Sequence, residues 1–226
     1  VNEILKDQPM VPAYFGFNVD LNRKGAENIQ HTKCAIPIRI SSDNIQHGVL
    51  IVDVRGEESF KKSHLPNSIN IMARHEKDKY ETWLGAIVRP EEPFYLVVES
   101  VDDIEKILDR TAKIGYETQV KGIMTLSKQS KKTSDYLDLE DFKRNQDRFT
   151  ILDIRNHGEI KEGKIFENAI PIPLNELRDK IDEVPTEKPI VVHCAGGYRS
   201  ASGSSILENK INQKIYDLSH AIKDFK

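Results

Sequence analysis

The fold is decided by residues 191–202, Val-Val-His-Cys-Ala-Gly-Gly-Tyr-Arg-Ser-Ala-Ser. Together with Ile190, the valines at its start form a continuous β-branched run, which is typical of a parallel strand buried on both faces. Small residues follow Arg199 and lead to Ile206 and Leu207, a pattern that predicts a helix lying close against a sheet. The stretch therefore predicts a strand, a tight loop and a helix in succession.

Two glycines and an arginine surround the cysteine of this loop. Gly196 and Gly197 can take positive φ without steric cost, so we expect backbone N–H groups to curl around Cys194. A thiol that faces N–H dipoles, a helix N-terminus and the Arg199 guanidinium ionises more easily than a free thiol, and the thiolate is the nucleophile. The same N–H groups would stabilise a persulfide anion, while Arg199 binds the anionic end of a donor. We therefore expect the sulfur of Cys194 to be anionic and reachable at neutral pH. The alternative is a buried structural cysteine, the commoner role of a free thiol.

The composition limits the classes of protein that fit. A chain of 226 residues contains one or two domains, and its net charge of −3 gives no reason to expect a nucleic acid or a membrane surface as partner. Cys34 and Cys194 lie far apart in the sequence and do not suggest a disulfide framework, so we expect a cytoplasmic location. The sequence shows neither a membrane-spanning apolar run nor a signal peptide. Because it begins at Val1 rather than methionine, we expect it to be part of a longer protein.

The N-terminal region has a different pattern. Residues 7–17 contain two prolines and three aromatics without a sustained period, which predicts an extended segment covering an apolar surface. Residues Cys34 to Ile40 predict a first strand, placed at an edge or a bulge by Pro37. Cys34 has no glycine loop or arginine beside it, and we interpret it as a packed bystander rather than a resolving thiol.

The same order of elements occurs twice in the chain. Residues 49–55 (Val-Leu-Ile-Val-Asp-Val-Arg) and 150–155 (Thr-Ile-Leu-Asp-Ile-Arg) are each followed by a glutamate. A second short apolar run then follows in both, at 64–71 and 168–172. A long repeat that contains whole supersecondary units indicates duplicated domains.

Helical patterns separate the predicted strands. Leu174, Leu177, Ile181 and Val184, for example, have the spacing of one helical face. Alternating strands and helices predict α/β domains, each a mainly parallel sheet with helices on both faces.

The Asp-x-Arg pair at 153 and 155 lies in the same repeat as the cysteine. Alternation along a strand places both side chains on one face at its end. We interpret Asp153 and Arg155 as structural residues near the site, with Arg155 pairing a nearby carboxylate such as Glu159, because the pair also occurs in the first repeat.

The first repeat lacks the reactive loop. Its counterpart strand, residues 94–100, leads directly into a helical pattern, with no cysteine, glycine pair or arginine in the turn. Glu99 or Ser100 stands where the nucleophile is expected, and Asp102 and Asp103 would repel an anion. We expect this repeat to serve packing, dimerisation or the orientation of a neighbouring domain. Residues 124–132 are interpreted as a polar, basic connector.

With these motifs in view, residues 35–226 resemble a tandem pair of rhodanese domains, members of a sulfurtransferase family. The loop from Cys194 to Ser200 is similar to that of proteins in which a metallo-β-lactamase-fold persulfide dioxygenase is fused to rhodanese domains, and residues 11–15 and 21–25 resemble the tail of that dioxygenase. The resemblance implies non-haem iron in a missing N-terminal domain and no metal or other cofactor in this chain. The implied organisation is a tail or extension at 1–33, an inactive domain at 34–127 and an active domain at 128–226.

The resemblance also implies a double displacement in sulfide detoxification. Cys194 and Arg199 would be catalytic, with Ala195, Gly196, Gly197, Tyr198 and Ser200 binding the substrate. The thiolate would take sulfur from thiosulfate or a small-thiol persulfide and pass it to a thiol, sulfite or cyanide. His193 is interpreted as a hydrogen-bonded structural residue. Homo-oligomers through the fused domain are expected.

Two other functions remain open. The first is a cysteine phosphatase or arsenate reductase of the rhodanese-like fold. The loop of those enzymes has five residues between the cysteine and the arginine, whereas only four residues separate Cys194 from Arg199. We therefore expect no phosphatase activity. A non-catalytic persulfide carrier or interaction module needs the same cysteine, and the sequence does not distinguish it from an enzyme.

Overall fold

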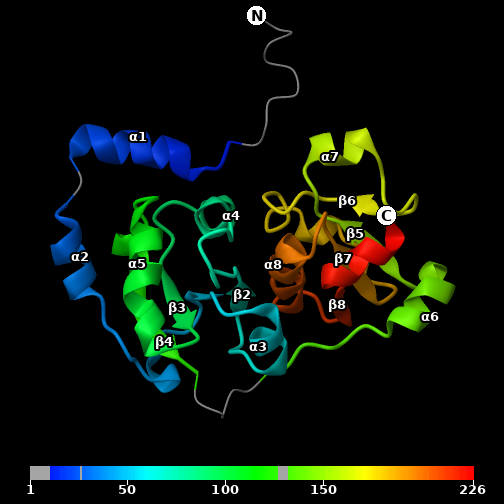
Figure 1. Cartoon of the computed structure of the whole chain (residues 1–226), viewed down its shortest axis with the longest axis horizontal. Coiled ribbons are helices and arrows are strands. Elements are labelled where there is room, and N and C mark those ends of the chain that lie inside the picture. Colours follow the sequence, from blue (N-terminus) through cyan, green and yellow to red (C-terminus); the bar gives the residue numbers. More distant parts are fainter. Residues whose placement is uncertain (1–10, 26, 127–131) are drawn as a thin grey trace, which may run out of the picture. The chain divides into compact units, whose positions relative to one another are not determined.

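The computed structural model describes residues 11–25, 27–126 and 132–226. The chain forms two compact units, Ala13–Asp135 and Tyr136–Lys226, and each contains one sheet flanked by helices (Figure 1). The repeat in the sequence therefore corresponds to a duplicated α/β architecture, as predicted. Residues 13–33 belong to the first unit.

The sheet of the first unit has four parallel strands in the order β2-β1-β3-β4. Every residue of its two central strands, β1 and β3, is buried, as their unbroken apolar runs predict. The strands are β1 (Leu50–Asp53), β2 (Ser68–Asn70), β3 (Phe94–Val98) and β4 (Val120–Thr125). The helices are α1 (Tyr14–Lys24), α2 (Ile29–Ala35), α3 (Glu57–Lys62), α4 (Tyr80–Ile87) and α5 (Ile104–Ala112), with 3-10 segments η1 (Ser42–Asn44), η2 (Val101–Asp103) and η3 (Glu117–Gln119).

The second unit repeats this topology in the strand order β6-β5-β7-β8, again parallel. Its strands are β5 (Thr150–Asp153), β6 (Ile170–Pro171), β7 (Ile190–His193) and β8 (Ile215–Asp217). Its helices are α6 (Leu139–Arg144), α7 (His157–Glu162) and α8 (Tyr198–Glu208), with 3-10 segments η4 (Gln146–Arg148), η5 (Ile181–Glu183) and η6 (Ser219–Phe225). Strand β6 lies beside β5 on one edge of the sheet, and β8 lies beside β7 on the other, so the strand order reverses between β5 and β7. In α/β sheets, ligands bind at the carboxyl ends of the strands at such a switch point.

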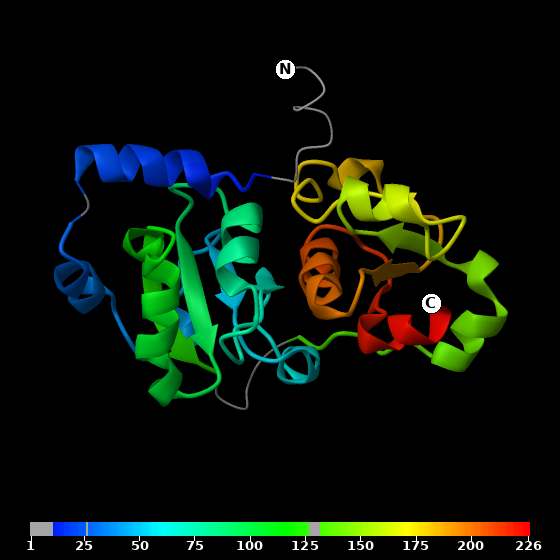
Figure 2. The same ribbon diagram turned by 45° about the horizontal axis from the view of Figure 1, so that its top comes forward.

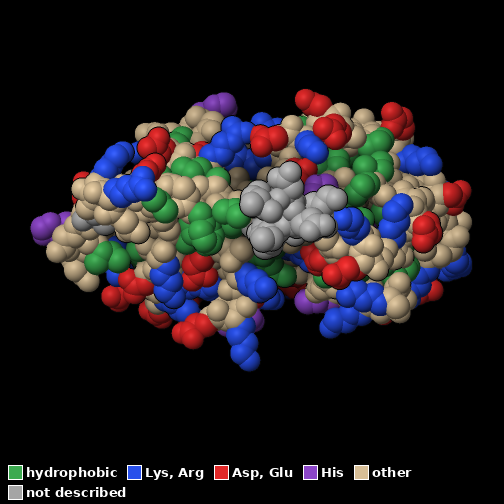
Figure 3. Space-filling model, turned by 90° about the horizontal axis from the view of Figure 1, so that it is seen from above, with side chains coloured by type: hydrophobic (Ala, Val, Ile, Leu, Met, Phe, Trp, Pro, Cys, Tyr) green, Lys and Arg blue, Asp and Glu red, His purple; other side chains and the backbone are tan. Residues whose placement is uncertain are grey.

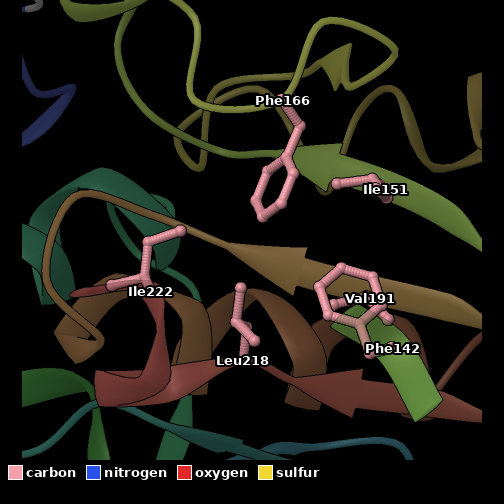
Figure 4. Packing of buried hydrophobic residues seen from close by; sticks show 6 residues of the cluster. All are labelled: Phe142, Ile151, Phe166, Val191, Leu218 and Ile222. Atoms are coloured by element: carbon pink, nitrogen blue, oxygen red, sulfur yellow. The ribbon is translucent and has the colours of Figure 1, made fainter. Parts of the chain in front are cut away.

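The apolar core of the second unit joins the sheet to its surrounding segments (Figure 4). Phe142 of α6 meets the ring of Phe166 edge to face, at 5.8 Å between centroids. The cluster comprises Phe142, Ile151, Phe166, Val191, Leu218 and Ile222. Because η6 contributes Ile222 to this core, the end of the described chain is held beside the sheet.

Helix α8 lies close against its sheet because its residues are small. Figure 2 shows this helix, in orange, beside the strands of its own unit. A Cβ added to Gly203 would fall 2.7 Å from Ile154 Cδ1 and 3.1 Å from Val192 Cγ1, so only glycine permits the approach. The hydroxyl of Ser205 donates to the carbonyl of Ser202, which satisfies a polar group inside a fully buried stretch. The prediction of a close-packed helix after the loop is confirmed.

Residues 14–24 form helix α1, where the sequence analysis predicts an extended segment. Tyr14 covers Gly85, at which an added Cβ would fall 2.1 Å from the tyrosine ring. One turn later, Phe17 meets Tyr116 edge to face at 5.8 Å. The helix is therefore stabilised by aromatic contacts with its own unit, and the prediction of an extended segment is wrong for these residues.

The predicted strand at 34–40 is also wrong. Cys34 lies in α2, and its side chain is exposed rather than packed. Within this stretch, Ile38 forms an isolated parallel bridge with Ile123. Pro37 has no N–H to donate, so a continuous ladder cannot form across it.

Residues 173–184 form turns and η5 instead of the predicted α-helix. Their backbone bonds include three-residue steps, such as Leu177 N–H to Leu174 O. Leu174, Leu177 and Val184 are nevertheless buried, so the apolar spacing marks the face that packs and not the type of helix.

The predicted connector at 124–132 begins too early. Met124 is buried in β4, and residues 127–131 lie outside the described residues. Met124 joins Ile51, Tyr95 and Val97 in the core of the first unit.

Charged side chains of both signs are interspersed over each unit on the face shown in Figure 3. This mixture agrees with the small net charge of −3. None of the helices in the described part of the chain combines the length and the hydropathy that crossing a bilayer requires.

Candidate functional site

Cys194 directly follows β7, at the carboxyl end of a central strand. Its preceding residue, His193, pairs with Asp153 of β5, so the cysteine stands at the switch point of the sheet. The loop from Cys194 to Gly197 then turns into α8. This is the strand, loop and helix that the sequence predicts.

The loop directs a backbone N–H at the sulfur. The N–H of Gly197 donates to Cys194 Sγ at 3.1 Å. Gly197 has φ of +100°, and an added Cβ would fall 2.8 Å from the backbone of Ser219 and His220. Gly196 does not have positive φ, and a Cβ there would meet nothing within 4 Å, so only the second glycine has the expected conformation.

Cys194 is only 1% exposed, whereas the sequence analysis predicts a reachable sulfur. The segment that covers its loop comes from the end of the chain: Ser219 and His220 lie against Gly197, and Lys226 Nζ donates to Ala195 O at 2.5 Å. Nothing in the motif around the cysteine reveals these contacts.

Arg199 is held by a carboxylate that the sequence analysis places elsewhere. Its Nη1 and Nη2 donate to Oε2 and Oε1 of Glu159 at 2.5 and 2.6 Å. Burial disfavours the charged guanidinium, but Glu159 and the Cys194 side chain outweigh this effect and raise the pKa of Arg199. The guanidinium thus interacts with both the Glu159 carboxylate and the Cys194 side chain.

Glu159 is fixed by its own helix. The N–H of Asn156 donates to Glu159 Oε2 at 3.0 Å in a capping box at the start of α7. Its hydrogen bond from Arg199 lowers the pKa of Glu159, against the opposing effect of burial. The carboxylate is therefore charged at neutral pH.

Asp153 and Arg155 form a buried pair, with Nη2 to Oδ2 at 2.7 Å. Arg155 also donates to the carbonyl of Gly163 at 3.0 Å and thereby anchors the segment after α7. The predicted pairing of Arg155 with the Glu159 carboxylate is wrong, because that carboxylate binds Arg199. The hydrogen bond from Arg155 to Glu159 goes to the backbone carbonyl, at 3.4 Å, and not to the carboxylate.

His193 is fully buried beside the site. Its ring nitrogens make no hydrogen bond within the described residues, and Nε2 lies 3.8 Å from Asp153 Oδ2. Burial lowers the pKa of His193 to about 4, although Asp153 opposes the shift. The residue is structural but not hydrogen-bonded as predicted, and it is neutral at physiological pH.

The remaining predicted binding residues line the loop in different ways. Ser200 is buried, and its hydroxyl donates to Gly197 O at 3.0 Å, which stabilises the turn. Gly196 is exposed, whereas Ala195 and Tyr198 are half-buried. The sequence analysis does not associate Ser219, His220 and Lys226 with the site, and it assigns Glu159 to Arg155 rather than to Arg199.

The first unit has a different residue at the cysteine position. Val97 pairs with Asp53 as His193 pairs with Asp153, so Val98 is the counterpart of Cys194 and the prediction of Glu99 or Ser100 is wrong. Val98 is completely buried. A cavity of about 230 Å³ lies at these strand ends, lined by Val54, Arg55, Arg74, Glu99, Asp103 and Ile107 among others.

The turn after β3 also has its backbone donors occupied. The Ser100 hydroxyl accepts the N–H of Asp102, while the Asp103 carboxylate accepts the N–H of Ser100. The Asp103 carboxylate brings negative charge to this turn, and both side chains already accept a backbone N–H. The first unit therefore has the scaffold without the thiol or its loop.

Comparison with known proteins agrees with this architecture. Residues 39–122 and 138–226 match the family described as the rhodanese-like domain. The chain belongs to this family. It is 29% identical over 84 residues to the uncharacterized protein YqhL of Bacillus subtilis, a match that covers 37% of this chain and 66% of that protein, slightly less than two thirds of its length.

Two solved structures are also similar. A rhodanese-related protein from Thermoplasma volcanium is 33% identical, with 36% of this chain and 80% of that chain covered and a TM-score of 0.33. A metallo-beta-lactamase from Staphylococcus aureus is 17% identical, with 56% of this chain and 33% of that chain covered and a TM-score of 0.44.

No group of three or more His, Cys, Asp or Glu side chains in the described ranges is arranged to hold a metal ion.

Proposed function

We propose that the chain is a sulfurtransferase that carries sulfane sulfur on Cys194. The observation that supports this most is the hydrogen bond from the Gly197 N–H to Cys194 Sγ, at 3.1 Å, in a site where the Arg199 guanidinium also interacts electrostatically with the Cys194 side chain. Both groups stabilise negative charge on sulfur, whether it belongs to a thiolate or to a persulfide. The donor is thiosulfate or a low-molecular-weight persulfide, and the acceptor is a thiol, sulfite or cyanide.

In the first step, the Cys194 thiolate attacks the outer sulfur of the donor. With thiosulfate, a new S–S bond forms at Cys194, the S–S bond of the donor breaks, and its electron pair leaves with sulfite. In the second step, an acceptor thiolate attacks the outer sulfur of the Cys194 persulfide, and the bonding pair returns to Cys194. No oxidant or reductant is needed, because the sulfur moves at constant oxidation state.

The buried sulfur requires the loop to open before the donor is attacked. Cys194 is 1% exposed, but Gly196, two residues further along the loop, faces open space. The proposal therefore includes a local movement of residues 194–199, with Arg199 meeting the anionic donor as it enters. We also propose that the chain acts as the C-terminal part of a persulfide dioxygenase fusion in sulfide detoxification, on the resemblance of its loop and N-terminal peptide.

Steady-state turnover tests this function against a carrier role. Thiosulfate with excess cyanide should yield thiocyanate over many turnovers, and Cys194→Ser should abolish it with an unchanged circular dichroism spectrum. Cys34→Ser, which alters the exposed cysteine of the first unit, is the matched control and should retain full activity. A single equivalent of sulfur transferred without further turnover would favour the carrier, and hydrolysis of an aryl phosphate lost in Cys194→Ser would favour the phosphatase.

A further inference from the structure

The cation expected to bind the donor is already paired. Both terminal nitrogens of Arg199 bind both carboxylate oxygens of Glu159, in the bidentate geometry of strong guanidinium pairs. The Arg199 side chain is 12% exposed and that of Glu159 is 33% exposed, so the carboxylate is the more accessible partner. A donor that approaches Arg199 therefore meets the charge of Glu159 as well.

The charges around the sulfur do not favour a dianion. With Cys194 ionised, the thiolate and Glu159 contribute two negative charges and Arg199 one positive charge, while the Lys226 ammonium is bound to the carbonyl of Ala195 in the same loop. Thiosulfate would add two more negative charges, whereas the persulfide of a small uncharged thiol adds one when ionised and none when protonated. Like charges at close range in a partly buried site cost far more than in water.

We propose that Glu159 is a specificity-determining residue that disfavours dianionic donors and leaves the persulfide of a small thiol as the preferred donor class. This inference rests on the proposed sulfur transfer to Cys194. The step is balanced as Cys194–S⁻ plus R–S–SH giving Cys194–S–SH plus R–S⁻. The outer S–S bond of the donor breaks, and its electron pair leaves with the thiolate R–S⁻.

Glu159 acts through its charge as well as its position. Glu159→Gln keeps a carbonyl oxygen that can accept from Arg199 or Asn156, but it removes the negative charge. Glu162 lies on the same helix with an exposed side chain, so Glu162→Gln is the matched control for a loss of charge away from the sulfur. A purely structural role for Glu159 would affect all donors alike.

The experiment measures the rate of sulfur loading on Cys194. Wild type, Glu159→Gln and Glu162→Gln are mixed with thiosulfate or with 2-hydroxyethyl persulfide generated in situ, whose carbon chain carries no charge. Samples are quenched with iodoacetamide, and the Cys194 peptide is quantified by mass spectrometry. We expect the persulfide to load wild type faster, and Glu159→Gln to raise the ratio of thiosulfate to persulfide rates about tenfold or more, with no change in Glu162→Gln.

Ionic strength gives a second measurement that needs no variant. Because the site and thiosulfate carry like charges, loading of wild type by thiosulfate should accelerate with added salt relative to loading by the persulfide. An unchanged ratio in Glu159→Gln, or an equal loss with both donors, would overturn the role of Glu159. Absence of sulfur on Cys194 with either donor in wild type would instead overturn the proposed function.

Discussion

The carboxylate of Glu159 binds the guanidinium of Arg199 with both oxygens, at 2.5 and 2.6 Å, and joins α7 to the start of α8. Because a bidentate pair fixes the plane of the guanidinium, it also fixes the direction from which Arg199 meets Cys194. The electrostatics of the sulfur therefore depend on a residue that lies far from it in the sequence.

Arg199→Lys keeps a positive charge but loses the planar fork. We expect loading of Cys194 by thiosulfate to slow about tenfold in Arg199→Lys and about a hundredfold in Arg199→Ala, which leaves Glu159 without its partner. Loading by a neutral persulfide should slow less in both. Arg148→Lys, which changes an exposed arginine of the same unit, is the control. Full-rate loading of Arg199→Ala by thiosulfate would contradict the donor-binding role of Arg199.

Gly197→Ala should disturb both the loop and the reactivity of the thiol. The residue has φ of +100°, and the new Cβ would fall 2.8 Å from backbone atoms of Ser219 and His220. We expect a loss of about 1–3 kcal/mol in the free energy of unfolding and slower alkylation of Cys194. Gly196→Ala, where a Cβ meets nothing within 4 Å, should change the free energy of unfolding by less than about 1 kcal/mol. Equal effects of the two substitutions, measured by urea unfolding, would show that the contact with Ser219 is unimportant.

Val98→Cys places a thiol at the position in the first unit that corresponds to Cys194. We expect it to accept no sulfur from thiosulfate, because the turn that follows presents Asp102 and Asp103 instead of glycines and an arginine. Mass spectrometry of the Val98→Cys, Cys194→Ser double variant measures this directly. A persulfide on the thiol introduced by Val98→Cys would mean that the scaffold alone suffices for the reaction.

Because of His193, we expect the free energy of unfolding to decrease in acid. The pKa of His193 is about 4 in the folded chain and about 6.5 when unfolded, so the unfolded chain binds the proton first. The contribution is complete above pH 6.5 and disappears as the pH falls towards 4, with about 2 kcal/mol lost between pH 7.5 and 5. Urea unfolding followed by circular dichroism should show a smaller loss in His193→Asn than in wild type.

The fluorescence of Trp83 provides the control for this prediction. Trp83 lies in the first unit, where His64 has a pKa that burial also lowers to about 4. The unfolding transition reported by Trp83 fluorescence should therefore depend on pH in the same way in wild type and His193→Asn. If the free energy of unfolding followed by circular dichroism fell equally in both proteins on acidification, the loss of stability could not be assigned to His193.

The strands could be predicted because central parallel strands are buried on both faces. Residues 190–192 and Phe94–Val98 form unbroken apolar runs, and both lie at the centre of their sheets. Helix α1 could not be predicted in the same way, since its stability depends on the contacts of Tyr14 with Gly85, which are distant in sequence. Residues 173–184 show the opposite limit: their apolar spacing predicts the buried face correctly, but three-residue backbone steps replace the α-helix.

The site was predictable in its local part only. The order of Cys194, Gly197 and Arg199 predicts the turn and its N–H bond to sulfur, because these residues are neighbours in the chain. The partner of Arg199 and the cover over Cys194 come from Glu159 and from residues 219–226, whose positions follow from the tertiary fold. Ion pairs between elements depend on that arrangement and leave no local motif.

The most direct test of the account is the mass of the Cys194 peptide after the full chain is incubated with 2-hydroxyethyl persulfide or with thiosulfate and quenched with iodoacetamide. The account predicts one additional sulfur atom on Cys194, removed by a later excess of cyanide, and none on Cys34. A Cys194 left unmodified by both donors in a folded protein, or sulfur found on Cys34 instead, would contradict it.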